Sequence, residues 1–242
     1  MPTPIGNLED ITLRALRLFK QADLILCEDS RVTRKLLNLL GVENKPKYVD
    51  LTRNHSFNWS GVSSVLDKLS DQQFSSEEII TDDNGSEYKV LLVSDSGTPA
   101  ISDPGREVIT MAIKNGLKFT ILPGASAVIP ATVFSNLIKK EFVFLGFLPL
   151  KKGRSTAWKA IITSQTPLVI YESSHRIIKF LNELSLNLEP EREVCVCNDI
   201  SKMYETVWRF RAGQVSLQQI PAKGEFVIII SGVSKLSQSP IS

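Results

Sequence analysis

The sequence predicts an α/β protein made of two α/β domains. In its first half, short apolar runs such as Ala22–Cys27 and Val90–Val93 alternate with segments whose apolar residues recur at helical spacing. This alternation is typical of a largely parallel sheet that helices cover on both faces. A second series of strands and helices follows the stretch Leu148–Arg154, which contains proline, glycine and basic residues. We therefore expect domains at residues 1–148 and 149–242.

The elements of the first domain follow in order. After a proline-bearing loop, Asp10 can cap a helix with Leu13, Leu16 and Phe19 inward, and Ser30 can cap a second helix. Strands are expected at residues 22–27, 47–51, 90–93, 118–122 and 142–147. Further helices are expected at 59–69 and 104–115, and a polar surface loop at 70–88.

The second domain shows the same two patterns. Helices are expected at residues 155–163 and after Ser173 or Ser174, either of which can serve as an N-cap. Strands are expected at 168–172, 193–197 and 226–231, with an extended segment at 203–210. The polar tail from Ser234 is expected to fray.

Composition limits the class of protein. The chain has 242 residues, of which 43% are hydrophobic and 22% charged, and its net charge is +2. This ordinary globular composition neither requires nor excludes a nucleic acid partner. No signal peptide is visible, and the longest apolar runs are far shorter than the ~20 residues that span a membrane. We expect a soluble protein of the cytoplasm or of an organelle, without membrane contact.

Cysteine and histidine patterns do not predict a metal site. The three cysteines lie in apolar, strand-like runs and are expected to be small buried hydrophobes in a reducing compartment. We expect Cys195 and Cys197 to face opposite sides of a strand and therefore not to bind one metal. The chain has no H-E-x-x-H motif and no zinc-binding spacing of cysteine and histidine, so no metal is predicted.

A small-residue loop after residues 90–93 is the strongest functional signal. It reads V-S-D-S-G-T-P-A-I-S-D-P-G-R from Val93 to Arg106, and Asp103 and Pro104 can begin the next helix. Open α/β sheets bind ligands where a strand ends in such a loop. A second loop, Pro123–Ala127, has the same character. Main-chain groups there can bind adenine, ribose or an amino-acid moiety, and the alternative for each loop is an ordinary turn.

Charged residues give two further candidates, each with a structural alternative. His175 stands at an expected helix start, where the helix dipole disfavours its cation, so a neutral imidazole can act as a base or bind RNA. The alternative is a capping arrangement in which Glu172 pairs with Arg176. The basic segment at residues 151–154 can contact phosphates, and the alternative is a solvated linker.

Seven ordered motifs resemble those of the ribosomal RNA small-subunit methyltransferase I family, a branch of the tetrapyrrole methylase superfamily. The motifs are P-T-P-I-G-N-L-E-D-I-T (Pro2–Thr12), C-E-D-S-R-V-T (Cys27–Thr33), V-S-D-S-G-T-P-A-I-S-D-P-G (Val93–Gly105), P-G-A-S-A (Pro123–Ala127), G-F-L-P…K-G-R (Gly146–Arg154), Y-E-S-S-H-R (Tyr171–Arg176) and K-G-E-F-V (Lys223–Val227). They extend over nearly the whole chain, and together they are far more specific than any one of them.

The resemblance implies S-adenosylmethionine bound in a cleft between the two domains of a homodimer. It implies methyl transfer to a cytidine ribose 2′-hydroxyl in small-subunit rRNA, with the free rRNA or a ribosomal particle as the substrate. It also implies that the cofactor contacts are Pro4, Asp95, Ser96, Gly97, Ile101, Ser102, Ser126, Ala127, Leu148 and Tyr171.

The implied chemistry calls for positioning and a base. A sulfonium is already activated, so in-line placement supplies most of the effect, whereas a ribose hydroxyl is a poor nucleophile near neutral pH. Candidates for the base, all near predicted strand ends, are Glu28, Asp29, Glu172 and His175. Candidate RNA contacts are Arg31, Arg34, Lys151, Lys152, Arg154 and Arg176. The alternatives are a tetrapyrrole methylase and a non-catalytic homologue that binds S-adenosylmethionine or RNA.

The chain departs from the family pattern in four places. The family's H-N-E-like segment after the third strand is here Asn54-His55-Ser56. Only Met1 precedes P-T-P-I-G-N, where the family has a short apolar strand, so we expect a central strand to be missing. The segment N-D-I-S-K (Asn198–Lys202) replaces R-E-L-T-K and loses an arginine. A small C-terminal extension of many members is absent.

Overall fold

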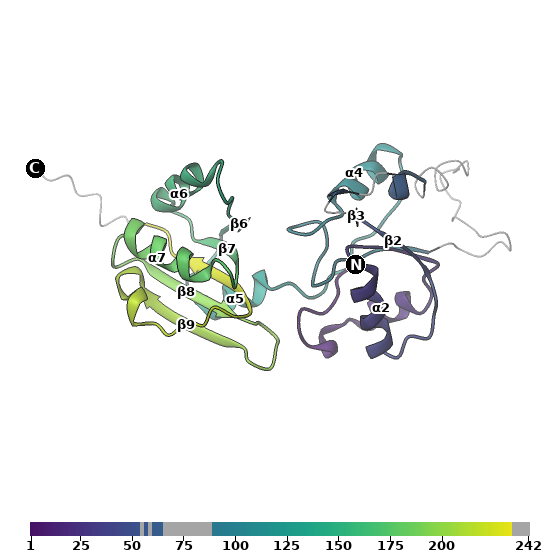
Figure 1. Cartoon of the computed structure of the whole chain (residues 1–242), viewed down its shortest axis with the longest axis horizontal. Helices are drawn as coiled ribbons and strands as arrows, with labels where there is room; N and C mark the ends of the chain where they lie inside the picture. Colours follow the sequence, from purple (N-terminus) through teal and green to yellow (C-terminus); the bar gives the residue numbers. More distant parts are fainter. Residues whose placement is uncertain (54–55, 58–59, 65–88, 234–242) are drawn as a thin grey trace, which may run out of the picture. The chain divides into compact units, whose positions relative to one another are not determined.

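The computed structural model describes residues 1–53, 56–57, 60–64 and 89–233 (Figure 1). The chain forms two compact units, Met1–Ser126 (unit 1) and a second unit that begins at Ala127 (unit 2). Residues 60–64 are helical. The remainder of the helix expected at 59–69, the loop expected at 70–88 and the tail from Ser234 lie outside the described residues.

Unit 1 contains the predicted parallel sheet. Its strands are β1 (Leu24–Cys27), β2 (Lys47–Asp50) and β5 (Val90–Leu92), in the order β2-β1-β5 and all parallel. A separate antiparallel pair joins β3 (Thr52–Arg53) to β4 (Ser56–Phe57). All four residues of β1 are buried, because the central strand of a parallel sheet is covered on both faces.

Helices cover both faces of β1, as predicted. Ile25 and Cys27 pack into a core with α1 (Leu13–Phe19) and α2 (Ser30–Leu39). Leu24 and Leu26 pack into a second core with α4 (Arg106–Lys114). The two cores follow from the period of two along a strand, which sends successive side chains to opposite faces.

Three helix starts in unit 1 differ from the prediction. A 3₁₀ turn, η1 (Leu8–Asp10), precedes α1, and the helix is capped by Thr12, whose hydroxyl accepts from the amide of Ala15 at 3.0 Å. Leu13 is consequently 86% exposed instead of inward. Asp29, not Ser30, caps α2 through its carboxylate. Helix α4 begins only at Arg106, because Gly105 adopts φ 124° at the N-cap position.

The strand expected at residues 118–122 is not present. These residues pair with no strand among the described parts of the chain, and only Leu122 is buried while Phe119 and Ile121 are exposed. The apolar pattern of these residues is typical of a strand, but a strand also needs a neighbouring strand with which to form hydrogen bonds.

Unit 2 holds a mixed five-stranded sheet. Its strands β6 (Val143–Phe147), β7 (Leu168–Ser173), β8 (Glu193–Asn198), β9 (Thr206–Arg211) and β10 (Glu225–Ile230) lie in the order β6-β7-β10-β8-β9. Only β6 and β7 are parallel, and the other pairs are antiparallel. Because β6 pairs with β7, residues 127–148 belong to unit 2, and the division falls earlier than the expected one at residue 148.

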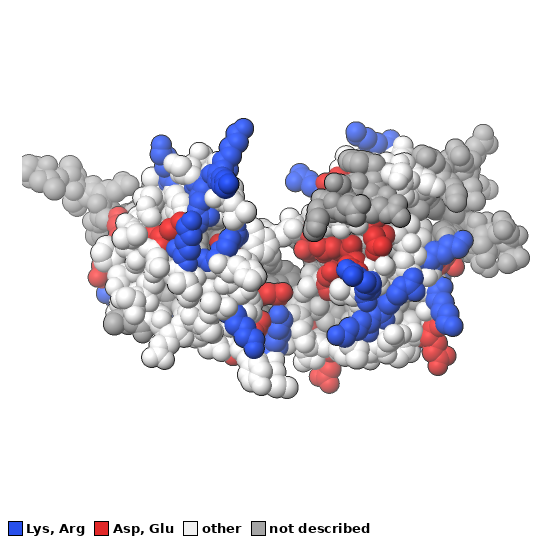
Figure 2. Space-filling view, in the orientation of Figure 1, with Lys and Arg blue, Asp and Glu red and all other residues white. Residues whose placement is uncertain are grey.

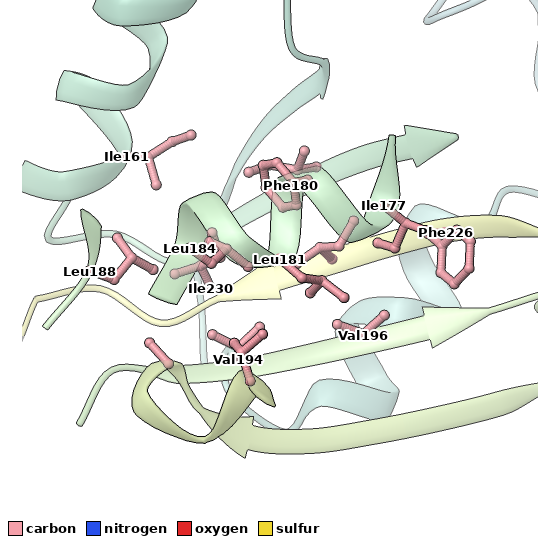
Figure 3. Close-up of a cluster of buried hydrophobic side chains, with 14 of the residues drawn as sticks. Ile161, Ile177, Phe180, Leu181, Leu184, Leu188, Val194, Val196, Phe226 and Ile230 are labelled. Atoms are coloured by element: carbon pink, nitrogen blue, oxygen red, sulfur yellow. The ribbon is translucent and has the colours of Figure 1, made fainter. Parts of the chain in front are cut away.

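Helix α7 (Ile177–Asn187) covers one face of this sheet. Ile177, Phe180, Leu181 and Leu184 point toward strand residues such as Phe226 and form the main core of unit 2 (Figure 3). Helix α6 (Arg154–Thr163) and the 3₁₀ helix η2 (Ala212–Leu217) add Ile161 and Val215 to the same core. Helix α5 (Val128–Ser135) contacts β8 and β10.

The expectation for Cys195 and Cys197 was wrong in its geometry. Their Sγ atoms lie 3.9 Å apart, because residues two apart on a strand share a face. Both are buried and free, as is Cys27, which confirms that the cysteines are small core residues. In the described residues no helix has the length and hydrophobicity needed to span a membrane.

Candidate functional site

Three loops of unit 1 are joined by hydrogen bonds. Thr3 and Gly97 form an antiparallel bridge, with N···O distances of 3.0 and 3.1 Å in the two directions. The hydroxyl of Thr98 donates to the carbonyl of Ala125 at 3.1 Å. The loop residues 2–8, 93–105 and 123–126 of unit 1 therefore meet at one place, although they are far apart in the sequence.

Two buried hydroxyls hold the turn in the middle loop. The Thr3 hydroxyl donates to the carbonyl of Ser94 at 3.1 Å, and the Ser94 hydroxyl donates to the carbonyl of Gly97 at 3.0 Å. Both side chains are about 1% exposed. Ala100, in the same loop, has φ 67°, a left-handed conformation that non-glycine residues rarely adopt outside constrained sites.

Glycine is required where these loops touch. Gly97 has φ 81°, and a Cβ atom there would lie 3.1 Å from Cγ2 of Ile5. A Cβ on Gly124 would lie 2.8 Å from Cβ of Pro2, closer than side-chain carbons approach one another. The absence of a side chain at Gly124 lets the first loop pack directly against the third.

We expect Gly124→Ala to separate the first loop from the other two, because the new methyl group and the Pro2 ring cannot occupy the same space. Amide hydrogen exchange at Thr3 and Gly97, whose bridge depends on this packing, should accelerate. The control is Gly41→Ala: its new methyl group meets open space, and any strain there comes from the positive φ of 65°, which Gly124 does not have. Equal protection of the two bridge amides in both variants would contradict the prediction.

Carboxylates gather where the parallel strands of unit 1 end. Glu28 and Asp29 follow β1, Asp50 ends β2, and Asp95 follows β5. A carboxylate oxygen of Asp95 accepts from the amide of Asp29 at 3.2 Å, and one of Asp50 accepts from the amide of Ser30 at 2.6 Å. Figure 2 shows acidic side chains grouped on one face of unit 1.

These carboxylates differ in acidity. Burial raises the pKa of Asp95 to about 6, and the nearby charge of Glu28 adds to the shift. Burial and the charge of Asp103 likewise raise the pKa of Glu28. By contrast, hydrogen bonds from Arg31 lower the pKa of Asp29 to about 2. Asp95 and Glu28 thus have the raised pKa values that are common at functional sites.

The basic side chains of α2 are exposed but already in contact with neighbours. Arg31 pairs with Asp29 at 2.6 Å, and the guanidinium of Arg34 lies 3.9 Å from the centre of the Tyr48 ring. Both arginines are solvent-accessible.

In unit 2, three sequence motifs meet at one end of the sheet. Glu172 on β7 and Asn198 on β8 both pair with Phe226 on β10, so all three lie in one row on one face. The turn after β8 contains Asp199 and Ser201 with φ 51° and 67°.

Lys202 connects the turn to the start of β10. Its ammonium donates to carboxylates of Asp199 and Glu225, at 3.0 Å each. Glu172 and Asn198 are 1% and 5% exposed, and each has one oxygen without a hydrogen-bond partner among the described residues.

The predicted alternative for Arg176 is confirmed. Its Nε donates to Glu172 at 2.6 Å, and its Nη1 donates to the main-chain carbonyl of Leu148 at 3.1 Å. His175, between these partners in sequence, is exposed. In the basic segment, Arg154 pairs with Glu183 and donates to the carbonyl of Pro149, whereas Lys151 and Lys152 are exposed.

The predicted cofactor residues fall in both units. Asp95, Ser96 and Gly97 lie together in the middle loop of unit 1. Pro4, Ile101, Ser102 and Ser126 also belong to unit 1, and Ala127, Leu148 and Tyr171 belong to unit 2. Ile101 is 62% exposed, whereas Leu148 is buried.

Comparison with known proteins places the chain in a family. The sequence profile of tetrapyrrole (corrin/porphyrin) methylases matches residues 2–216. The chain belongs to the tetrapyrrole methylase family. It is 37% identical to the ribosomal RNA small subunit methyltransferase I of Halalkalibacterium halodurans, over 95% of this chain and 74% of that protein. It is 34% identical to the protein of the same name from a Hydrogenobaculum species, over 100% of this chain and 98% of that protein.

Solved structures of the tetrapyrrole methylase fold also match. A uroporphyrin III C-methyl transferase from Thermus thermophilus has a TM-score of 0.58 at 16% identity, covering 95% of this chain and 94% of that one. A diphthine synthase has a TM-score of 0.62 at 15% identity, covering 94% of this chain and 87% of that one. These likenesses confirm the predicted α/β fold.

Sequence reasoning missed several residues at these tetrapyrrole methylase loops. Thr3 and Ser94 stand inside the quoted motifs, but their hydroxyl bonds depend on long-range contacts that spacing does not show. No sequence motif marks Asp50 as a site residue, because it ends the weakly apolar strand β2. Phe147 is 53% exposed and its ring meets that of Tyr171 edge-on at 5.6 Å, which a buried strand pattern does not predict. Among the described residues, no three or more histidine, cysteine, aspartate or glutamate side chains are placed so that they could hold a metal ion.

Proposed function

We propose that this chain transfers the methyl group of S-adenosylmethionine to the 2′-hydroxyl of a cytidine in small-subunit rRNA. The observation that carries the proposal is the similarity, over 95% or more of the chain, to proteins named ribosomal RNA small subunit methyltransferase I. We further propose that it works as a homodimer in the cytoplasm, on free rRNA or on a ribosomal particle.

The loops of unit 1 suit this cofactor. They offer main-chain groups and small side chains and lack a phosphate-binding glycine pattern, which fits a ligand without phosphate. The carboxylates of Glu28, Asp29, Asp50 and Asp95 favour a positive charge nearby, and they favour a cationic cofactor over its neutral thioether product. In unit 2, Leu148 and Tyr171 remain predicted cofactor contacts.

The residues supply positioning and proton transfer. When bound, S-adenosylmethionine would supply an activated methyl group to the ribose oxygen and would leave as S-adenosylhomocysteine, while a base of this chain would take the hydroxyl proton. Positioning accounts for most of the effect. A base helps most when its pKa lies near the working pH.

The structure favours two of the four proposed bases. Glu28 has a raised pKa, and the His175 side chain is exposed. Asp29 is held ionised by Arg31, which makes it a weak base, and Glu172 is buried and bound by Arg176. We assign Asp29 and Glu172 to structural roles and keep Glu28 and His175 as candidates.

Single-turnover kinetics separate the two candidates. Removing the base should lower the rate of methyl transfer by about 10²–10⁴-fold. We expect either Glu28→Gln or His175→Ala to show this loss while retaining S-adenosylmethionine binding, and Asp29→Asn to show a smaller one. If both variants transfer methyl at the wild-type rate, neither side chain is the base.

We expect the exposed lysines of the basic segment to contact RNA phosphates. Neutralising Lys151 and Lys152 by glutamine should weaken binding of an rRNA fragment and reduce the slope of log K against log[salt] by about 0.7 per lysine. The control is the pair Lys45→Gln and Lys114→Gln, which removes two other exposed lysines. Equal slopes in the two double variants would indicate that charge number alone, and not this segment, matters.

The proposed function is tested with radiolabelled S-adenosylmethionine and three acceptors: small ribosomal subunits, free small-subunit rRNA and a tetrapyrrole precursor. We expect label in RNA, in the subunit or in the free form. Label in the tetrapyrrole alone, or cofactor binding without transfer to any acceptor, would contradict the proposal.

A further inference from the structure

We infer that Arg176 is a positioning residue for the cofactor, acting through the Leu148 carbonyl, and not a phosphate contact. The inference rests on the proposed function. It assigns a role to the last residue of the Y-E-S-S-H-R motif, which sequence reasoning placed among the RNA contacts.

The guanidinium of Arg176 joins the ends of two parallel strands. Nε donates to Oε1 of Glu172, the second-last residue of β7. Nη1 donates to the carbonyl of Leu148, the residue that follows β6. Phe147 and Tyr171 are paired neighbours on these strands. The arginine therefore fixes the spacing of the two strand ends where Leu148 and Tyr171, both predicted cofactor contacts, lie.

Glu172 makes this connection rigid. Its side chain is 1% exposed, and Oε1 also accepts from the amide of Ser173 at 2.8 Å. A buried carboxylate is costly unless a cation and further donors satisfy it, so Glu172 and Arg176 hold each other in one geometry. The amide of Arg176 in turn donates to the carbonyl of Ser173 at 3.0 Å, which fixes its backbone.

The same contacts leave little of Arg176 for a phosphate. The side chain is 21% exposed, its charge is paired at 2.6 Å, and its guanidinium carbon lies 5.9 Å from the centre of the Phe147 ring. A planar fork that reaches a carboxylate and a carbonyl at once is a property of arginine that lysine does not share.

Arg176→Lys is the decisive variant, because it keeps the positive charge beside Glu172 and loses the fork. As a positioning residue, Arg176 should be needed for cofactor affinity: we expect the Kd for S-adenosylmethionine to rise about tenfold, with KM rising and kcat little changed. If Arg176 had a structural role alone, Arg176→Lys would lower the unfolding temperature and leave the Kd and KM for S-adenosylmethionine unchanged. The control is Arg211→Lys, since Arg211 pairs with Glu191 at the opposite end of the sheet.

A second variant tests the phosphate alternative. Glu172→Gln/Arg176→Gln removes both charges together, so that no unpaired charge is left buried. We expect its slope of log K against log[salt] for an rRNA fragment to equal that of the wild type. A fall of about 0.7 would identify a phosphate contact and overturn the inference.

Two further outcomes are decisive. An unchanged Kd for S-adenosylmethionine in Arg176→Lys would overturn the inference and leave the proposed function standing. A wild-type protein that binds no S-adenosylmethionine would overturn the proposed function, and the inference with it.

Discussion

Asp95→Asn is expected to weaken S-adenosylmethionine binding by tenfold or more while making the free protein more stable at alkaline pH. The carboxylate lies among Glu28, Asp29 and Asp50, and burial with their charges raises its pKa to about 6. The amide of asparagine keeps an oxygen that can accept from the amide of Asp29 but carries no charge. We therefore expect the ionised Asp95 carboxylate to lower the stability of the fold while it contributes to cofactor binding.

The pH dependence has a definite sign. Because the pKa of Asp95 is higher in the folded chain than the 3.8 of an ordinary aspartate, ionisation of Asp95 weakens the fold. Its stabilising contribution is complete below pH ~4 and is lost as the pH rises through about 6. The unfolding temperature of Asp95→Asn should therefore exceed that of the wild type at pH 8 and match it at pH 4.

Cofactor binding should change in the opposite direction. Without the negative charge, affinity for cationic S-adenosylmethionine should fall by tenfold or more, about 1.4 kcal/mol, and affinity for neutral S-adenosylhomocysteine should fall less. Calorimetric titration of both ligands at pH 8 measures the difference. Equal losses for the two ligands would show that Asp95 acts by shape and not by charge.

Arg192→Leu is expected to cause the largest loss of stability in unit 2. The buried guanidinium donates to the main-chain carbonyls of Ile162, Ser164 and Ser231, at 2.8, 3.2 and 2.7 Å. It thereby ties the end of α6 to the end of β10, and its burial lowers its own pKa. Leucine would leave three carbonyls without this donor, at a cost of about 3 kcal/mol in the free energy of unfolding.

Arg211→Leu provides the matched control for this loss. Arg211 is the last residue of β9, but its ion pair with Glu191 is exposed, and such pairs contribute under about 1 kcal/mol. Urea unfolding of both variants gives the two free energies. A loss for Arg192→Leu no greater than that for Arg211→Leu would show that water replaces the guanidinium at the three carbonyls.

The parallel sheet of unit 1 followed from the sequence because its strands are short apolar runs between amphipathic helices. The strand expected at 118–122 has the same pattern, but strand pairing depends on a partner that local sequence does not contain. For the same reason, the place of β6 in the sheet of unit 2, and with it the division at Ser126, was not predicted.

The site was predictable to a similar degree. The small-residue loops stood out, and the pairing of Glu172 with Arg176 was expected only as the capping alternative at a helix start. The bridge between Thr3 and Gly97 joins residues over 90 positions apart, and the raised pKa of Asp95 depends on burial. Neither is encoded in a local pattern, so both required the folded chain.

The most direct measurement for the central claim is mass spectrometry of nucleosides from small-subunit rRNA after incubation with the protein and methyl-labelled S-adenosylmethionine. Digestion to nucleosides separates methylation of the ribose from methylation of the base. The account predicts label in 2′-O-methylcytidine, formed by the wild type and strongly reduced for Asp95→Asn. Label in a base methyl group, or in the ribose of another nucleoside, would contradict it.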